Sequence, residues 1–430
     1  MAQQGDGMEK RREKREAQRK RRQAQARRMR MTLLLAAVVL VACGVAIYRM
    51  TQNSGAESTE ASAQVQTVPT TEETKETSPA QRSPITTIHI KAAGDLNVTD
   101  NVVNAGMAVT NYDFSPVFKD VASILSDADL TVMNFEGNVC GEPYGTETTS
   151  APAALLTALR SCGVDLLQVA NSCSINNGLN GLTSTLQAIR AAGIEPVGAF
   201  SSSAEFRESG GYTMTEAQGV KVGFVAFTKG LGGRGMPAGN EDLVNLLYTD
   251  YASEYKTIDK ERITSILKAM ESEKPDITIA LLHWGSEFND SISSSQKRII
   301  DLMRQNGVDA IIGTHPHYVQ QITFDRENGF LVAYSLGDFI SDAARAGSEY
   351  SILLDLEITK DHANGTTSIT GYDYTPLFSV VEEGKPTRIV RIQEALSAYT
   401  AGHTGAVLKE TYDDMLYALT RIEARVNGEG

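Results

Sequence analysis

Three of the six histidines of this chain lie at the ends of two short apolar segments. His283 follows residues 277–282, and His315 and His317 follow residues 310–312. Both segments are rich in β-branched residues and bounded by polar residues or glycine, which predicts buried strands. Neutral imidazole is a common ligand of zinc, iron and manganese, and α/β sheets build their sites at the carboxyl ends of strands. A single histidine there is usually a hydrogen-bonded cap, but a His-Pro-His tip together with a His-Trp-Gly-x-Glu tip predicts a metal site.

Other predicted strands also end in polar residues. Asp95, Glu136 and Asn171 each end or directly follow such a strand, and Glu287 lies four residues beyond His283. Carboxylate and amide oxygens combined with imidazoles suit Mn, Fe or Zn, often as a pair of ions that activates water. We therefore expect one or two divalent ions, held by Asp95, Glu136, Asn171, His283, His315 and His317.

The elements that must position these residues alternate along the chain. Helical spacing of apolar residues predicts helices at residues 114–125, 153–160, 182–192, 258–270 and 296–305. Helices that separate strands in this way predict an α/β domain with a largely parallel sheet. Later segments indicate antiparallel strands and a closing helical segment, at residues 352–358, 367–374, 388–392 and 397–426. We expect residues 86–345 to form the main domain and residues 346–430 to complete it.

A basic segment precedes an apolar one at the start of the chain. Residues 1–30 hold twelve Lys or Arg and four acids, a net charge of +8. Residues 31–48 are apolar apart from Thr32, at the lower limit of length for a helix that spans a bilayer. The basic residues before this segment favour a cytoplasmic amino terminus. We therefore expect a cytoplasmic tail (1–30), a single-pass transmembrane signal anchor (31–48) in the cell membrane, and an extracytoplasmic remainder.

Two other features of this region affect the expected topology. A Leu-Val-Ala-Cys sequence ends at Cys43 and has the form of a lipoprotein processing site, so a lipidated mature protein that begins at Cys43 is the alternative. Residues 49–85 are dominated by Ser, Thr, Glu, Gln and Ala with almost no large apolar side chain. Such a segment cannot bury enough surface to offset its ordering entropy, which predicts a disordered stalk.

Composition restricts the class of partner and the use of disulfides. From residue 31 onward there are 28 basic and 49 acidic residues, which argues against nucleic acid as a partner because duplex binding needs a basic face. Outside the apolar segment there are three cysteines, Cys140, Cys162 and Cys173. An odd number allows at most one disulfide and leaves a free thiol, and the pairing stays open.

The strand-end motifs, taken in order, resemble those of the CapA family of capsule and poly-γ-glutamate synthesis proteins. The matching motifs lie between residues 88 and 340: Gly94-Asp95, Asn134-Phe135-Glu136, His283-Trp284-Gly285-x-Glu287, Gly313-Thr314-His315-Pro316-His317 and Tyr334-Ser335-Leu336-Gly337. The resemblance implies a fold like that of the calcineurin-type metallophosphoesterases, a layered α/β/β/α sandwich. It also implies an anionic envelope polymer and other membrane synthesis or export subunits as partners.

The chain departs from the family pattern in its middle motif. Where the family has Ala-Asn-Asn-His followed by an Asp, this chain has Ser172, Cys173 and Asn176. The resemblance would place at Cys173 the histidine that protonates a leaving group. Cys173 and Glu287 are the candidate catalytic residues. Cys173 could also ligate a soft metal as a thiolate, or simply be a small buried residue. Near the end, Asp338 replaces the family's Asn in Gly-Asn-Phe.

Two functions remain open from the sequence. The first is a metal-dependent, phosphoesterase-like protein of capsule or poly-γ-glutamate synthesis or export. The second is a catalytically weakened relative that binds polymer or organises an export complex, which the substitutions in the middle motif favour. The glycine-rich segment 229–235 contains Lys229 and Arg234. It is either a mobile surface loop or a segment that holds a polyanionic chain.

Overall fold

A computed structural model describes residues 84–403 and 405–429. The expected tail and anchor, and all but the last two residues of the expected stalk, lie outside the described residues. None of the helices in the described part of the chain is long and apolar enough to cross a membrane.

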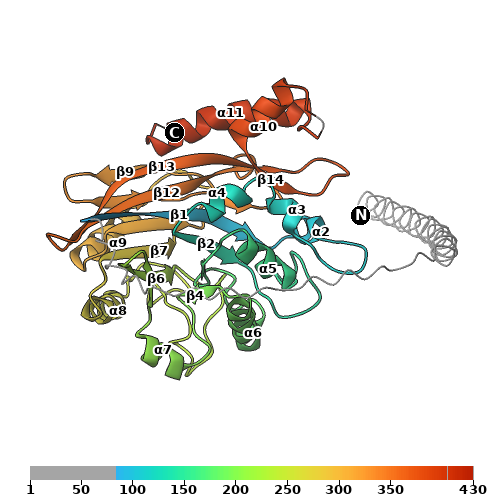
Figure 1. Cartoon of the computed structure of the whole chain (residues 1–430). Coiled ribbons are helices and arrows are strands. Elements are labelled where there is room, and N and C mark those ends of the chain that lie inside the picture. The colour runs from blue at the N-terminus through green and yellow to red at the C-terminus, as the bar shows by residue number, and fades with distance from the viewer. Residues whose placement is uncertain (1–83, 404, 430) are drawn as a thin grey trace, which may run out of the picture. The chain divides into compact units, whose positions relative to one another are not determined.

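Two β-sheets form the centre of the domain (Figure 1). Within the described residues, the first sheet has eight strands in the order β14 (Arg388–Arg391), β13 (Thr366–Val380), β12 (Tyr350–Asp361), β1 (Ile85–Asn97), β2 (Leu130–Glu136), β3 (Leu166–Gln168) and β4 (Glu195–Val197), with β11 (Asp338–Ile340) also paired to β1. The second has six, in the order β5 (Thr213–Ala217), β6 (Val220–Thr228), β7 (Ile277–His283), β8 (Ala310–Thr314), β10 (Phe330–Ala333) and β9 (Ile322–Asp325). Strands β1–β4 are parallel to one another, as are β6, β7, β8 and β10.

Helices cover the outer faces of the two sheets (Figure 1). Helices α10 (Ile392–Thr400) and α11 (Lys409–Val426) pack on the β12–β14 side of the first sheet, and α8 (Lys260–Ser272) and α9 (Ser294–Gln305) pack on the second. The remaining helices are α2 (Asp100–Ala105), α3 (Ser115–Phe118), α4 (Ala122–Ser126), α5 (Ala154–Ser161), α6 (Gly178–Ala191) and α7 (Ser203–Ser209). This arrangement confirms the predicted α/β sandwich.

The side chains of strand β7 contribute to two separate apolar clusters, one on each face of the strand. Ile277, Ile279 and Leu281 belong to the apolar cluster that fills the space between the two sheets. Ala280 and Leu282 belong to a second cluster, which includes side chains of α8 and α9. Successive side chains of a strand point to opposite faces, so a strand buried on both faces reads as a continuous apolar run. The unbroken run before His283 is therefore the signature of a central strand.

The register of the parallel strands brings their polar ends together. Asp95 of β1 lies beside Asn134 of β2, and His283 of β7 lies beside Thr314 of β8. Because these strands run in the same direction within each sheet, their carboxyl ends meet at one edge. The two sheets pack face to face there, so residues from both reach a common site.

Candidate metal centre

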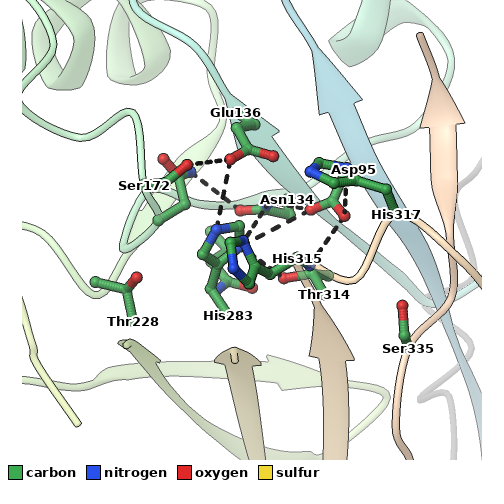
Figure 2. A network of polar contacts seen from close by, with 12 residues as sticks. Asp95, Asn134, Glu136, Ser172, Thr228, His283, Thr314, His315, His317 and Ser335 are labelled. Carbon is green, nitrogen blue, oxygen red and sulfur yellow. Dashed lines mark hydrogen bonds and ion pairs between the residues drawn. The ribbon is translucent and has the colours of Figure 1, made fainter. Parts of the chain in front are cut away.

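Five of the predicted site residues converge at this edge (Figure 2). Asp95 comes from β1, Glu136 ends β2 and His283 ends β7, while His315 and His317 directly follow β8. All five are buried, with at most 8% of any one residue exposed. The sequence therefore located the main residues of the cluster.

The backbone around these residues requires special conformations. His315 and His317 both lie in the left-handed region, with φ of +91° and +58°. The His315 amide donates a 3.0 Å hydrogen bond to Asp95 Oδ2, and His317 Nδ1 donates a 2.7 Å bond to Asp338 Oδ1. Such strained positions persist only where the surroundings hold them in place, and they cluster at functional sites.

The close approach of β1 to the segment before β11 explains the glycine of the Gly94-Asp95 motif. A Cβ atom at Gly94 would lie 1.8 Å from the carbonyl oxygen of Gly337, which is too close for any other residue. The adjacent Asp95 amide donates a 3.0 Å hydrogen bond to that same carbonyl. Glycine at position 94 thus lets the segment before β11 pack against β1, which brings Asp338 to the site.

Hydrogen bonds from two asparagine side chains hold the Asp95 carboxylate in place. Asn134 Nδ2 donates to Asp95 Oδ1 at 2.5 Å, and Asn171 Nδ2 donates to Asn134 Oδ1 at 3.1 Å and to the Phe135 carbonyl at 2.7 Å. Asn171 Oδ1 in turn accepts a 3.0 Å bond from the Cys173 amide. In this arrangement Asn171 holds Asn134 and the turn that follows β3. Its predicted role as a metal ligand stays a prediction.

Three buried atoms of the cluster have no hydrogen-bond partner. They are Glu136 Oε2, His283 Nε2 and His315 Nδ1. The ligand atoms of these three residues lie within 4.8 Å of one another, and the same holds for Asp95, Glu136 and His317. Burying polar atoms without partners is costly, and a carboxylate with two imidazoles is a donor set that transition-metal ions prefer. The residues present therefore fit a divalent metal.

Burial and neighbouring charges shift the pKa values of several residues in the cluster, and those of Glu136 and His315 shift in the direction that favours metal binding. Burial, followed by the proximity of His283, lowers the pKa of His315 well below its usual value, so that its ring is neutral and keeps a free lone pair. Burial would raise the pKa of Glu136, but the facing His283 lowers it overall, so this carboxylate is ionised. Burial and the nearby Glu136 raise the pKa of Asp95 to about 7.

His317 differs from the other two histidines. Burial opposes its positive charge, but the adjacent Asp338 carboxylate raises the pKa of His317 to about 11. Asp338 is almost fully buried, and burial raises its pKa although His317 lowers it. In the absence of an ion, this pair is a buried imidazolium–carboxylate contact at the edge of the cluster.

The two candidate catalytic residues lie on different sides of the cluster. Cys173 Sγ is 3.9 Å from Ser172 Oγ, and Ser172 Oγ donates a short hydrogen bond to Glu136 Oε1. Burial raises the pKa of Cys173, so the thiol is protonated. Glu287 is exposed, and its carboxylate lies within 4.8 Å of ligand atoms of His315 and His317. The catalytic role of each stays a prediction.

Several residues of the site were absent from the predicted set. Asn134 holds Asp95, Ser172 bonds Glu136, Thr314 Oγ1 lies 3.2 Å from His283 Nδ1, and Asp338 bonds His317. Asn134 had a usable signal, because it is two residues before Glu136 and so lies on the same face of β2. Asp338 begins a strand of only three residues, which is too short for a periodic pattern. Cys140, Cys162 and Cys173 form no disulfide with one another.

Comparison with known proteins gives consistent matches. The family model of the bacterial capsule synthesis protein PGA_cap matches residues 89–343. The chain is 25% identical to the capsule biosynthesis protein CapA of Bacillus anthracis over 65% of this chain and 64% of that protein. It is 24% identical to the PGA biosynthesis protein CapA of Bacillus subtilis over 64% of this chain and 70% of that protein. The match thus spans slightly less than two thirds of the Bacillus anthracis relative.

Solved structures with a similar fold include the calcineurin-like phosphoesterase YfkN from Bacillus subtilis, with a TM-score of 0.41 and 16% identity over 79% of this chain and 97% of that chain. The family model covers more than half of the chain and includes every residue of the cluster described above. The chain belongs to the bacterial capsule synthesis protein family PGA_cap.

Proposed function

We propose that this protein is a membrane-anchored, extracytoplasmic component of capsule or poly-γ-glutamate synthesis or export, with a metal-dependent, phosphoesterase-like site. One observation carries the proposal: ligand atoms of Glu136, His283 and His315 lie within 4.8 Å of one another, and each of these buried residues has a polar atom without a hydrogen-bond partner. The CapA relatives support the proposed pathway. An anionic envelope polymer and membrane-bound synthesis or export subunits are the proposed partners.

Some residues of the site would bind the metal, and others would hold these ligands in place. Glu136, His283 and His315 would hold one ion. Asp95, Glu136 and His317 would hold a second, and His317 would lose its proton on binding it. A bound divalent ion would supply Lewis-acid polarisation of a substrate oxygen and activation of water. Asn134 keeps the Asp95 carboxylate in place through its 2.5 Å hydrogen bond, and Ser172 does the same for Glu136. Mn, Fe and Zn are the proposed metals.

A specific observation favours a second function, a catalytically weakened protein that binds polymer or organises an export complex. The thiol of Cys173 is protonated because burial raises its pKa, and the amide of Asn176 carries no titratable proton. The segment after β3 therefore offers no group that exchanges protons near neutral pH. In this alternative the metal holds the polymer or the fold and hydrolysis is slow.

Metal content tests the proposal directly. The full-length protein, purified in detergent after growth with Mn, Fe or Zn, should contain about one or two ions per chain. His283→Ala and His315→Ala should each reduce this content strongly, because each removes a ligand and disturbs the geometry of the rest. Elemental analysis by mass spectrometry provides the measurement.

The matched control is His362→Ala, which removes an imidazole that bonds Thr86 Oγ1 in an exposed turn. This variant should keep the full metal content. A wild-type protein that contains none of the three metals under any supply would contradict the proposal. Equal loss in His362→Ala would show that the effect is not specific to the site.

A further inference from the structure

The glycine-rich segment 229–235 is fixed at both ends to segments that deliver site residues. At its start, Lys229 Nζ donates a 2.7 Å hydrogen bond to the Gly285 carbonyl, in the segment that follows β7. The same ammonium group lies 4.7 Å from the ring centroid of Tyr255. The segment is therefore attached beside His283.

The other end packs on the turn that follows β3. A Cβ atom at Gly232 would lie 3.1 Å from the Ser172 carbonyl oxygen, and the residue has a φ of +60°. Arg234 Nη1 donates a 2.7 Å hydrogen bond to Asn176 Oδ1. Segment 229–235 thus lies against the turn that holds Ser172 and Cys173, next to Glu136.

The positive charge of Arg234 is not neutralised by this contact. Its hydrogen-bond partner is a neutral amide, and among residues 84–403 and 405–429 it forms no ion pair. Several other arginines of the domain do form ion pairs, for example Arg160 with Asp165 and Arg190 with Glu205. The side chain of Arg234 is exposed, so its remaining N–H donors face solvent.

A second unpaired arginine lies at the opposite flank of the cluster. The guanidinium of Arg345 lies 4.5 Å from the ring centroid of Phe288, and that ring stacks on His317 with centroids 5.1 Å apart. Arg345 is exposed and forms no ion pair within the described residues.

The two arginines therefore flank the proposed metal centre. Ser172, beside Arg234, and His317, beside the Phe288–Arg345 stack, lie on opposite sides of the histidine cluster (Figure 2). In a chain with a net charge of −13, two unpaired guanidinium groups at one site stand out as anion-binding groups. A small ligand at the metal could contact one of them, whereas an extended ligand could contact both.

We propose that Arg234 and Arg345 are the two ends of a binding site for an extended polyanion that crosses the metal centre. The ligand class is a chain with repeated carboxylate or phosphate groups. This inference rests on the proposed function and names the residues that would hold the anionic polymer at the same site. Asn176 acts as a positioning residue, which holds Arg234 in place and leaves its charge free for the ligand.

Binding of defined polyanions to the full-length protein tests this proposal. The probes are a γ-linked glutamate decamer, a polyphosphate of about ten units and inorganic phosphate, each titrated by calorimetry with and without added Mn. Arg234→Gln and Arg345→Gln should each raise the Kd of an extended probe about fivefold, as expected for one exposed charge pair, and the double variant about 25-fold. The extended probe that binds more tightly to the wild type identifies carboxylate or phosphate as the recognised group. Inorganic phosphate is too short to contact both Arg234 and Arg345. Its Kd should therefore rise no more in the double variant than in either single variant.

Two further variants separate a specific site from a general effect of charge. Asn176→Asp keeps every arginine but places a carboxylate against Arg234, so it should weaken the extended probe as much as Arg234→Gln does. Arg326→Gln is the matched control, because Arg326 stacks on Phe324 in the turn between β9 and β10, at the amino ends of the parallel strands. Its Kd should stay within about twofold of the wild type.

The outcomes distinguish this inference from the proposed function. Unchanged Kd values in Arg234→Gln and Arg345→Gln would overturn the inference, and so would an equal loss in Arg326→Gln. Metal content measured on the same samples reports on the proposed function separately. A wild-type protein without metal that still shows the fivefold losses would refute the metal site and leave the polyanion site standing.

Discussion

At the scale of single residues, the polar side chains of the site divide into two kinds. Glu136, His283 and His315 keep a buried atom free, whereas Asn134 and Asn171 use their amides to hold a neighbour. Free atoms are suited to bind an ion, and the amides keep the geometry fixed when that ion is absent. Supporting contacts of this kind orient the ligands of a metal site and raise its affinity for the ion.

The middle motif gives a prediction about catalysis. The protonated thiol of Cys173 is a poor proton donor or acceptor near neutral pH, so hydrolysis of bis(p-nitrophenyl) phosphate by the wild type should be slow. The triple variant Ser172→Asn, Cys173→His, Asn176→Asp introduces an imidazole and a carboxylate beside Glu136. Initial rates of nitrophenolate release should then rise by about 10²–10⁴-fold, the usual contribution of general acid–base catalysis.

Cys173→Ala separates the possible outcomes of this experiment. If the thiol has no chemical role, this variant should hydrolyse the diester as slowly as the wild type. Fast wild-type hydrolysis that Cys173→Ala leaves unchanged would show that the interpretation of the motif is wrong. Fast hydrolysis that the variant abolishes would make the thiol part of the mechanism.

The sequence predicted which strand-end residues lie together better than it predicted the residues that support them. His283, His315 and His317 were accessible because an apolar strand followed by histidine is a local pattern. Asp338 was not, since its partner His317 lies 21 residues away and their contact depends on the pairing of β11 with β1. Contacts of this kind depend on which strands pair with each other. The local sequence pattern carries no information about that pairing.

At the scale of elements, four aspartates mark the starts of parallel strands. Asp129, Asp165, Asp276 and Asp309 each immediately precede a strand, and each carboxylate accepts a hydrogen bond from the backbone amide of the neighbouring strand, at 2.7 to 3.0 Å. The aspartate amide donates back to the carbonyl of the same neighbouring residue. These reciprocal bonds fix the register in both sheets, and register is what aligns the polar strand ends.

Asp309 gives a prediction about stability and pH. Burial raises the pKa of its carboxyl group to about 6, and within the described residues no cation pairs with it. The folded state therefore binds the proton more tightly than the unfolded state, so the free energy of unfolding should fall as pH rises from about 4 to 6 and then level off. Asp309→Asn removes this ionisation and can still accept the Thr278 N–H bond. Above pH 6.5 it should be more stable than the wild type by about 1 kcal/mol, because solvent screening at this partly exposed site reduces the stabilisation below the upper limit of ~3 kcal/mol.

Denaturant unfolding with a chelator present, at pH 4 and at pH 7.5, measures this difference without a contribution from metal. Asp165→Asn is the control, because Asp165 pairs with Arg160 at 2.5 Å and should lose stability at pH 7.5. A lower free energy of unfolding for Asp309→Asn at pH 7.5 would contradict the prediction.

Most elements could be predicted from periodicity, and the exceptions have a tertiary cause. The single helix predicted over residues 114–125 is two short helices, α3 and α4, separated at Val121. There the Asp120 carbonyl accepts a 3.1 Å hydrogen bond from Arg391 Nε instead of continuing the helical ladder. Arg391 ends β14, some 270 residues away in sequence, so no local pattern could reveal the break.

At the scale of the whole molecule, the chain enters the domain far from its site. Strand β1 begins at Ile85 and reaches Asp95 ten residues later, which corresponds to roughly 30 Å of extended strand. The carboxyl-terminal third is needed to complete the site edge, since β12 pairs with β1 along its length and β11 delivers Asp338.

The proposed anchor gives a prediction about the intact protein in cells. If residues 31–48 are an uncleaved membrane anchor, the mature protein should keep its basic tail and remain with the membrane. Protease added to whole cells should then cut within residues 49–85 and release a fragment that begins near Ile85, because the composition of that segment predicts an exposed stalk. Immunoblotting of cells and medium, with mass spectrometry of the amino terminus of both forms, provides the measurement.

The released fragment should keep its metal, since every proposed ligand lies beyond the cut. A mature protein that begins at a lipid-modified Cys43 would instead establish the lipoprotein alternative, and a domain that external protease cannot reach would refute the extracytoplasmic location.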